Sequence, residues 1–125
     1  MRRLVYISAL LVSVALVHSP ATYADEAVTT MANIVIGLKH FPSDADKAAL
    51  ATIADGDSSD AVKSVASAIA SISHKVTDAD KATLAAISAD DDASAELRKL
   101  AMIVGNLNHM PSANAVASLE GLANP

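Results

Sequence analysis

The sequence predicts an all-α fold of six helices, organised as three helix-turn-helix hairpins in a single domain, residues 25–125. Two observations support this prediction. A turn motif that begins with histidine occurs at His40, His74 and His109, so its copies are 34 and 35 residues apart, a period typical of a repeat made of two helices. Apolar residues recur at helical spacing before and after each copy. Three such hairpins would stack as a short α-solenoid or close into a compact helical bundle.

The segment before each histidine is predicted to form the longer helix of its repeat. Side chains spaced by three and four residues lie on one stripe of a helix. Large apolar residues stand 12, 9, 5 and 2 positions before the histidine in every repeat: Val28, Met31, Val35 and Leu38, then Val62, Val65, Ile69 and Ile72, then Leu97, Leu100, Val104 and Leu107. Alanine stands eight positions before each histidine, where a small side chain allows neighbouring helices to approach closely: Ala32, Ala66 and Ala101.

The turn that follows each histidine contains a signal for the start of the next helix. A hydroxyl residue lies three positions on, at Ser43, Thr77 and Ser112. Its oxygen can cap the helix by accepting a hydrogen bond from a free backbone N–H. Asp46 and Asp80 lie three residues further along, in the pattern of a capping box with Asp in place of the usual Glu. The third copy of the turn lacks these aspartates, which suits a terminal repeat.

A shorter helix is predicted after each turn, with apolar residues 10 and 13 positions beyond the histidine: Leu50 and Ile53, Leu84 and Ile87, Leu119 and Leu122. The segments between repeats, residues 55–60 and 88–92, are rich in turn-forming and N-cap residues. The six helices are therefore expected at about residues 27–40, 44–54, 60–74, 78–88, 92–108 and 113–122, with ends uncertain by about two to four residues.

Residues 1–24 are predicted to form a secretory signal peptide that is cleaved from the mature protein. Arg2 and Arg3 precede an apolar stretch at residues 4–17, and the small residues of the segment 21–24 provide a cleavage site. The stretch is shorter than the roughly 18 residues that a membrane-spanning helix requires. The mature protein is therefore expected to start near Asp25 and to be periplasmic or secreted, with no stable membrane insertion after cleavage.

The composition of the predicted mature chain argues against several classes of function. Without Arg2 and Arg3, 7 basic residues face 14 acidic residues, a net charge of −7, and such a surface repels nucleic acid. Phe41 is then the only aromatic residue, so platforms for stacking bases or sugars are missing. The chain contains no cysteine, which excludes disulfides, thiol chemistry and c-type haem attachment. No cofactor is predicted.

The three turn histidines are the candidate metal ligands. His40, His74 and His109, together with Asp46 and Asp80, are ligand types that zinc, copper and nickel prefer. In an open stack, however, equivalent turns would lie about 16–20 Å apart, since neighbouring helix axes are about 8–10 Å apart. A single ion would then reach only one of them, although a bundle that folds back could bring two together. The preferred interpretation is that each histidine closes a helix by donating to free carbonyl groups.

The acidic segments between the repeats invite comparison with a calcium-binding loop. Asp55, Asp57 and Ser59 have the spacing of the first EF-hand ligands. Asp60 stands where that loop needs glycine, and Ala66 stands where it needs a bidentate glutamate. Capping of the following helices and solvation are the preferred explanation for these acidic residues.

The sequence shows no assembled catalytic constellation, so an enzyme is not predicted. We expect a non-catalytic helical-repeat protein that binds another protein in its compartment, as an adaptor, inhibitor, immunity-type or chaperone-like protein. Phe41 is a candidate contact for such a partner, although packing back onto its own hairpin is the preferred placement. Self-association through the last helix, at Leu119 and Leu122, is a further possibility. A periplasmic metal-binding protein is the alternative function.

Overall fold

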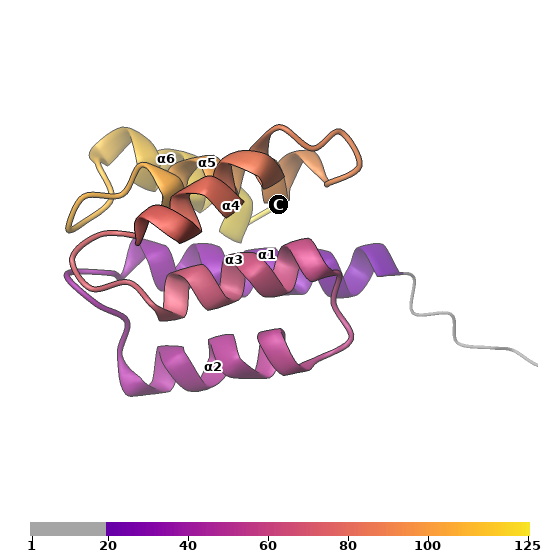
Figure 1. Ribbon diagram of the computed structural model, residues 1–125, viewed down its shortest axis with the longest axis horizontal. Helices are drawn as coiled ribbons and strands as arrows, with labels where there is room; N and C mark the ends of the chain where they lie inside the picture. The colour runs from indigo at the N-terminus through magenta and orange to yellow at the C-terminus, as the bar shows by residue number, and fades with distance from the viewer. Residues whose placement is uncertain (1–19) are drawn as a thin grey trace, which may run out of the picture.

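The computed structural model describes residues 20–125, which form six α-helices and no β-strand longer than an isolated bridge (Figure 1). The all-α prediction is therefore confirmed. In chain order the helices are α1 (Pro20–Ile36), α2 (Asp44–Asp55), α3 (Asp60–Ala70), α4 (Asp78–Ser88), α5 (Ala95–Gly105) and α6 (Ala113–Ala123).

The short helices begin where the capping residues predict. Ser43, Thr77 and Ser112 are the N-caps of α2, α4 and α6, and each side-chain oxygen accepts a hydrogen bond from the backbone N–H three residues ahead. The complete capping box forms in the first repeat, where the Ser43 N–H also donates to Asp46 Oδ2. Hydrogen bonds from backbone N–H groups to side chains of each turn thus fix where α2, α4 and α6 begin.

The long helices end earlier than predicted, four residues before each histidine. Their final turns are closed by backbone bonds of the i to i−3 type, from Leu38 to Val35, Ile72 to Ile69 and Leu107 to Val104. Such bonds tighten the chain as it leaves a helix. The helical spacing of apolar residues continues to Leu38, Ile72 and Leu107 because these side chains are still buried, although their backbone is already outside the helix.

The core consists of the residues that the repeat pattern singles out. All twelve apolar positions of the long segments are buried, and so are Leu50, Leu84 and Leu119 of the short helices. Ala32, Ala66 and Ala101 are fully buried, so the small residues of the repeat belong to the core. Ile53 is the exception, since it is only half-buried.

Helices that are neighbours in the chain pack on one another, but the two kinds of connection differ in how much contact they bring. Each short helix makes its most extensive contacts with a long helix of another repeat: α2 with α3, α4 with α5, and α6 with α1. The three long helices also contact one another. The expected packing of helices that are neighbours in the chain is present, and it is more extensive across the links between repeats than across the histidine turns. The apolar residues of α2, α4 and α6 are buried mainly by the next repeat in the ring.

Contact between α6 and α1 closes the three repeats into a compact bundle. The hydroxyl of Thr29 in α1 donates to the Leu122 carbonyl in α6, at 3.4 Å. Leu119 and Leu122 are buried, so the apolar stripe of α6 is already covered by its own chain. The stripe is therefore not exposed for pairing with a second copy.

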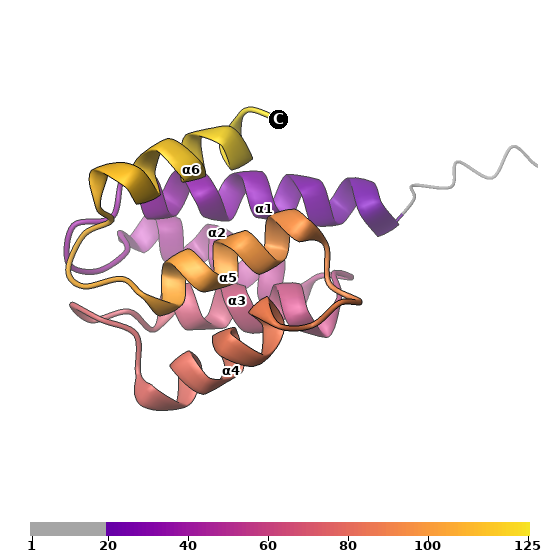
Figure 2. The ribbon, with the colours of Figure 1, turned by 90° about the horizontal axis from the view of Figure 1, so that it is seen from above.

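Closure places equivalent parts of the three repeats at the same end of the molecule. In Figures 1 and 2 the turns at residues 37–43, 71–77 and 106–112 lie together at the left-hand end. The loops that join one repeat to the next, residues 56–59 and 89–94, lie at the opposite end with the carboxyl terminus. We call these the turn end and the loop end.

Most of the predicted signal peptide, residues 1–19, lies outside the described part of the chain. Helix α1 begins at Pro20, a position that suits proline because the first helical N–H has no partner within the helix. The predicted mature start at Asp25 consequently lies within α1. No helix in residues 20–125 combines the length and apolar character that crossing a membrane requires.

Candidate metal centre

Three imidazole rings, one from each repeat, meet at the turn end. The ring centroids of His40 and His74 are 5.1 Å apart, those of His74 and His109 are 5.3 Å apart, and those of His40 and His109 are 5.7 Å apart. Each ring offers one nitrogen to a group in which all three ligand atoms lie within 4.8 Å of one another. All three side chains are exposed. This arrangement is a candidate metal centre, which we call the histidine cluster.

The backbone of the turns holds the three histidines side by side. The His74 N–H donates to the His40 carbonyl at 2.7 Å, and the His109 N–H donates to the His74 carbonyl at 2.6 Å. Lys75 and Asn108 form an antiparallel bridge between the second and third turns. The cluster is therefore built on main-chain hydrogen bonds that link successive repeats, in addition to the packing of the helices.

Buried side chains anchor the chain on both sides of His40 and His74. In the second repeat, Ile72 and Val76 are buried two positions before and two positions after the exposed His74. In the first repeat, Leu38 and Pro42 are buried in the same positions around His40. The apolar core thus fixes the turn from beneath and leaves the imidazole at the surface.

Two of the histidines adopt a left-handed backbone conformation, with φ of 66° at His74 and 67° at His109. This conformation costs an L-residue other than glycine about 1–2 kcal/mol. Glycine adopts it without that penalty, although histidine is among the non-glycine residues found most often in this region. Strained residues of this kind are concentrated at functional sites, which supports a role for the imidazoles themselves.

The separation of about 16–20 Å expected for an open stack does not apply, because the repeats close into a bundle. The alternative, in which a folded-back bundle brings two turn histidines together, is exceeded, since all three converge.

The interpretation of the histidines as helix-closing residues is wrong. The long helices end at Ile36, Ala70 and Gly105, before the histidines are reached, and backbone N–H groups close their last turns. Within residues 20–125, no imidazole donates a hydrogen bond to a helix carbonyl.

Asp46 and Asp80, the other predicted metal ligands, are not part of the cluster, which in the described chain consists of the three histidines alone. Asp46 Oδ2 accepts from the Ser43 N–H at 3.1 Å, and Asp80 Oδ2 accepts from the Thr77 hydroxyl at 2.9 Å. Both carboxylates therefore serve the N-caps of their helices.

Two large apolar side chains are exposed beside the cluster. Phe41 follows His40 and is 63% exposed, and Met110 follows His109 and is 56% exposed. The preferred placement of Phe41 against its own hairpin is therefore wrong. The turn end combines metal-ligand chemistry with exposed apolar surface.

The distances between the histidine nitrogens fit a metal ion after a small adjustment. Zinc–nitrogen bonds of about 2.0–2.1 Å in a tetrahedral site place the nitrogens about 3.4 Å apart. A pair at the 4.8 Å limit has to close by about 1.4 Å to reach that spacing. Exposed imidazoles can make this movement by rotating about their side-chain bonds, because rotamer changes in exposed residues are rapid. The helices need not move.

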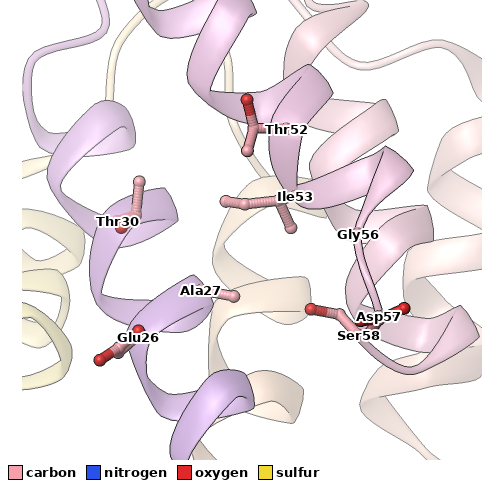
Figure 3. Close-up of a pocket in the computed structure, with 8 residues that line it drawn as sticks. All are labelled: Glu26, Ala27, Thr30, Thr52, Ile53, Gly56, Asp57 and Ser58. Carbon is pink, nitrogen blue, oxygen red and sulfur yellow. The ribbon is translucent and has the colours of Figure 1, made fainter.

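The concave surface between α1 and α2 is a weaker candidate site. Its cavity of about 330 Å³ lies towards the loop end, and Figure 3 shows Thr30 on α1 and Thr52 and Ile53 on α2 among its lining residues. Glu26 and Asp57 supply the carboxylates, and no histidine, lysine or cysteine lines it. The Thr52 hydroxyl donates to the Ala48 carbonyl, and within the described residues no hydroxyl of the cavity is hydrogen-bonded to either carboxylate, so the activated nucleophile of covalent catalysis is not assembled there.

No family model, curated protein or solved structure matches the chain. The case for a function therefore comes from the arrangement of its own residues.

Proposed function

We propose that this protein binds a transition-metal ion of the zinc, copper and nickel class through His40, His74 and His109. The observation that supports the proposal is the convergence of three ligand nitrogens within 4.8 Å of one another, from residues spread over 70 positions of sequence. Imidazole nitrogen is a preferred ligand of all three metals. The left-handed backbone at two of the three positions supports the proposal independently.

The turns perform three tasks for the ion. Their buried residues fix the backbone, their exposed imidazoles are accessible from solution, and their main-chain bonds hold the three ligands near their final positions. An imidazole binds metal in its neutral form, so protons compete with the ion and binding weakens in acid. Because each ligand comes from a different repeat, the ion cross-links the first, second and third turns.

Metal titration tests the proposal. The protein is produced from the full-length coding sequence, and intact mass spectrometry establishes its amino terminus. Isothermal titration with Zn²⁺, Cu²⁺ and Ni²⁺ is expected to give one ion per chain for at least one metal. A variant in which His40, His74 and His109 are all replaced by glutamine is expected to lose that binding. Equal binding by the protein and this variant would refute the proposal.

The matched control for the titration is the double variant Asp55→Asn, Asp57→Asn at the loop end. It removes two potential oxygen ligands and leaves the histidine cluster intact. We expect its metal affinity to stay within about twofold of the unmodified protein, because these carboxylates do not belong to the cluster. The amino terminus found by mass spectrometry also tests the predicted cleavage after Ala24, and fractionation of the producing cells tests the predicted export.

Binding of a partner protein is a second candidate function, and the exposure of Phe41 and Met110 at the turn end favours it. Large exposed side chains of this kind anchor interfaces, and the acidic surface suits a partner with basic residues. Affinity capture from the fraction that contains the protein is expected to retain a partner, and Phe41→Ala to release it. Retention of the same partner by Phe41→Ala would exclude this residue as the anchor.

A further inference from the structure

We infer that a divalent ion in the histidine cluster completes its coordination sphere with a small anion from solution. The inference rests on the proposed metal binding and specifies what else that site binds. Zinc takes four ligands in most protein sites, and copper(II) and nickel(II) take at least four. The cluster supplies three. At least one coordination position is therefore left for a ligand from outside the cluster.

The remaining position faces away from the bundle. Each histidine is exposed, whereas the chain beside it is anchored by buried residues such as Leu38, Ile72 and Leu107. The core thus lies beneath the ring of imidazoles, and solvent lies above it. A further ligand has direct access to the ion from this side.

Charge decides which kind of ligand is favoured. Three neutral imidazoles leave the two positive charges of the ion uncompensated, and within the described residues no carboxylate belongs to the cluster. The carboxylates in the adjoining turns, those of Asp46 and Asp80, accept hydrogen bonds at their N-caps. The bound ion is consequently the largest local charge at the turn end, and an anion gains more from it than a neutral donor does.

The exchange itself is a ligand substitution. A water molecule bound to the ion leaves, the anion takes its place through one lone pair, and neither the metal nor the anion changes oxidation state. Arrangements with three protein ligands and one exchangeable position are typical of catalytic zinc sites, whereas structural zinc sites are closed by four protein ligands. The cluster therefore belongs with the open type.

Azide binding to the copper(II)-loaded protein tests the inference. Azide is the probe because a copper-bound azide produces a charge-transfer band in the near ultraviolet. We expect this band to grow and saturate at one azide per copper, with copper still bound afterwards. A copper-loaded protein that shows no such band would overturn the inference, while its bound copper would leave the proposed function standing. Failure to bind any of the three metals would instead refute the proposed function, and the inference with it.

Two further measurements exclude an anionic ligand that belongs to protein. The double variant Asp46→Asn, Asp80→Asn retains an acceptor oxygen for each cap, and we expect its dissociation constant for azide to stay within about twofold. A tenfold tighter binding of azide would show that one of these carboxylates competes for the position, and would overturn the inference. Sedimentation is expected to show a copper-loaded monomer. Copper-dependent dimerisation that azide reverses would assign the position to a carboxylate of a second copy, with the same consequence.

Discussion

The two ends of the bundle differ in how many equivalent segments they contain. Three repeats have three internal turns but only two links between repeats, and the first and last helices take the place of the third link. At the turn end the three equivalent segments are joined by main-chain hydrogen bonds from His74 to His40 and from His109 to His74. At the loop end the two links lie apart (Figure 1). A complete ring of equivalent residues therefore exists only at the turn end.

The chemistry of the two ends follows from this difference. At the loop end, hydroxyl and acidic residues serve local structure: Ser59 and Ser94 cap α3 and α5, and Asp90 Oδ1 accepts from the Asp92 N–H at 2.9 Å. Asp91 approaches Arg98 to 3.6 Å while fully exposed, a kind of ion pair that contributes little to stability. At the turn end, the histidines make no comparable local contact. Acidic residues at the loop end are explained by capping and solvation, whereas the histidines are not.

Weakening the contact between α6 and α1 should have the largest effect on stability, and it should loosen the turn end more than the loop end. Leu119 of α6 is fully buried, and Leu119→Ala is expected to lower the free energy of unfolding by about 2–5 kcal/mol, as measured by urea titration. Hydrogen exchange should speed up at the His109 amide more than at the amide of Ala89, the C-cap of α4, which donates to the Ala85 carbonyl. A loss below 1 kcal/mol, or equal acceleration at both amides, would contradict the described closure.

A bound metal ion is expected to stabilise the protein through the histidines of the turn end and not through residues of the loop end. Ligand at 100 times its dissociation constant stabilises a one-site protein by about 2.7 kcal/mol, which raises the melting midpoint by several degrees for a domain of this size. We expect the full shift for Asp91→Asn at the loop end and none for His74→Gln, in melts followed by circular dichroism. Loss of the shift in Asp91→Asn, or its retention in His74→Gln, would contradict metal binding at the turn end.

Two threonines of the α4 region distinguish the loss of an N-cap from the loss of any hydroxyl group. Thr77 Oγ1 accepts from the Asp80 N–H at 3.1 Å, so Thr77→Ala should lower the free energy of unfolding by about 0.5–2 kcal/mol. Thr83 is the matched control, because its hydroxyl donates to Ala79 within the same helix and is exposed. Thr83→Ala should be neutral or slightly stabilising, since alanine has the higher helix propensity. Equal losses in the two variants, measured by chemical denaturation, would argue against the cap.

The smallest expected effect is the difference in stability between glycine variants of two turn histidines. His74 has a positive φ and His40 does not, so glycine relieves backbone strain only at position 74. Without metal, His74→Gly should be more stable than His40→Gly by about 1 kcal/mol. Urea titration of both variants with a chelator present measures the difference. If the two variants have the same stability, position 74 carries no strain for glycine to relieve.

The helices and their core were predictable because each repeat contains its own signals. The spacing of the apolar residues identified the buried positions, and Ser43, Thr77 and Ser112 marked where the short helices begin. The ends of the long helices were not predictable in the same way. Leu38 is buried, although it lies in a segment that is no longer helical. The spacing of apolar residues marks which positions are buried, so it cannot show where the helix itself ends.

The candidate site was half predictable. The recurrence of His40, His74 and His109 at one position of the repeat marked them as a set, and their residue type marked them as possible ligands. Their separation was not predictable, because it depends on whether three hairpins stack in a line or close into a ring. Asp46 and Asp80 were equally plausible ligands by residue type, and only their hydrogen bonds within the caps distinguish them from the histidines.

The sequence by itself determined the all-α class, the number of helices, the caps and the buried stripe, because these depend on interactions between residues a few positions apart. The tertiary structure decided which helices pair, that α6 closes on α1, and that three distant histidines share one end of the bundle. The same kinds of local signal recur in all three repeats, so they cannot encode how one repeat is placed against another. That placement depends on which surfaces the repeats bury together, and here it brings the histidines within reach of a single ion.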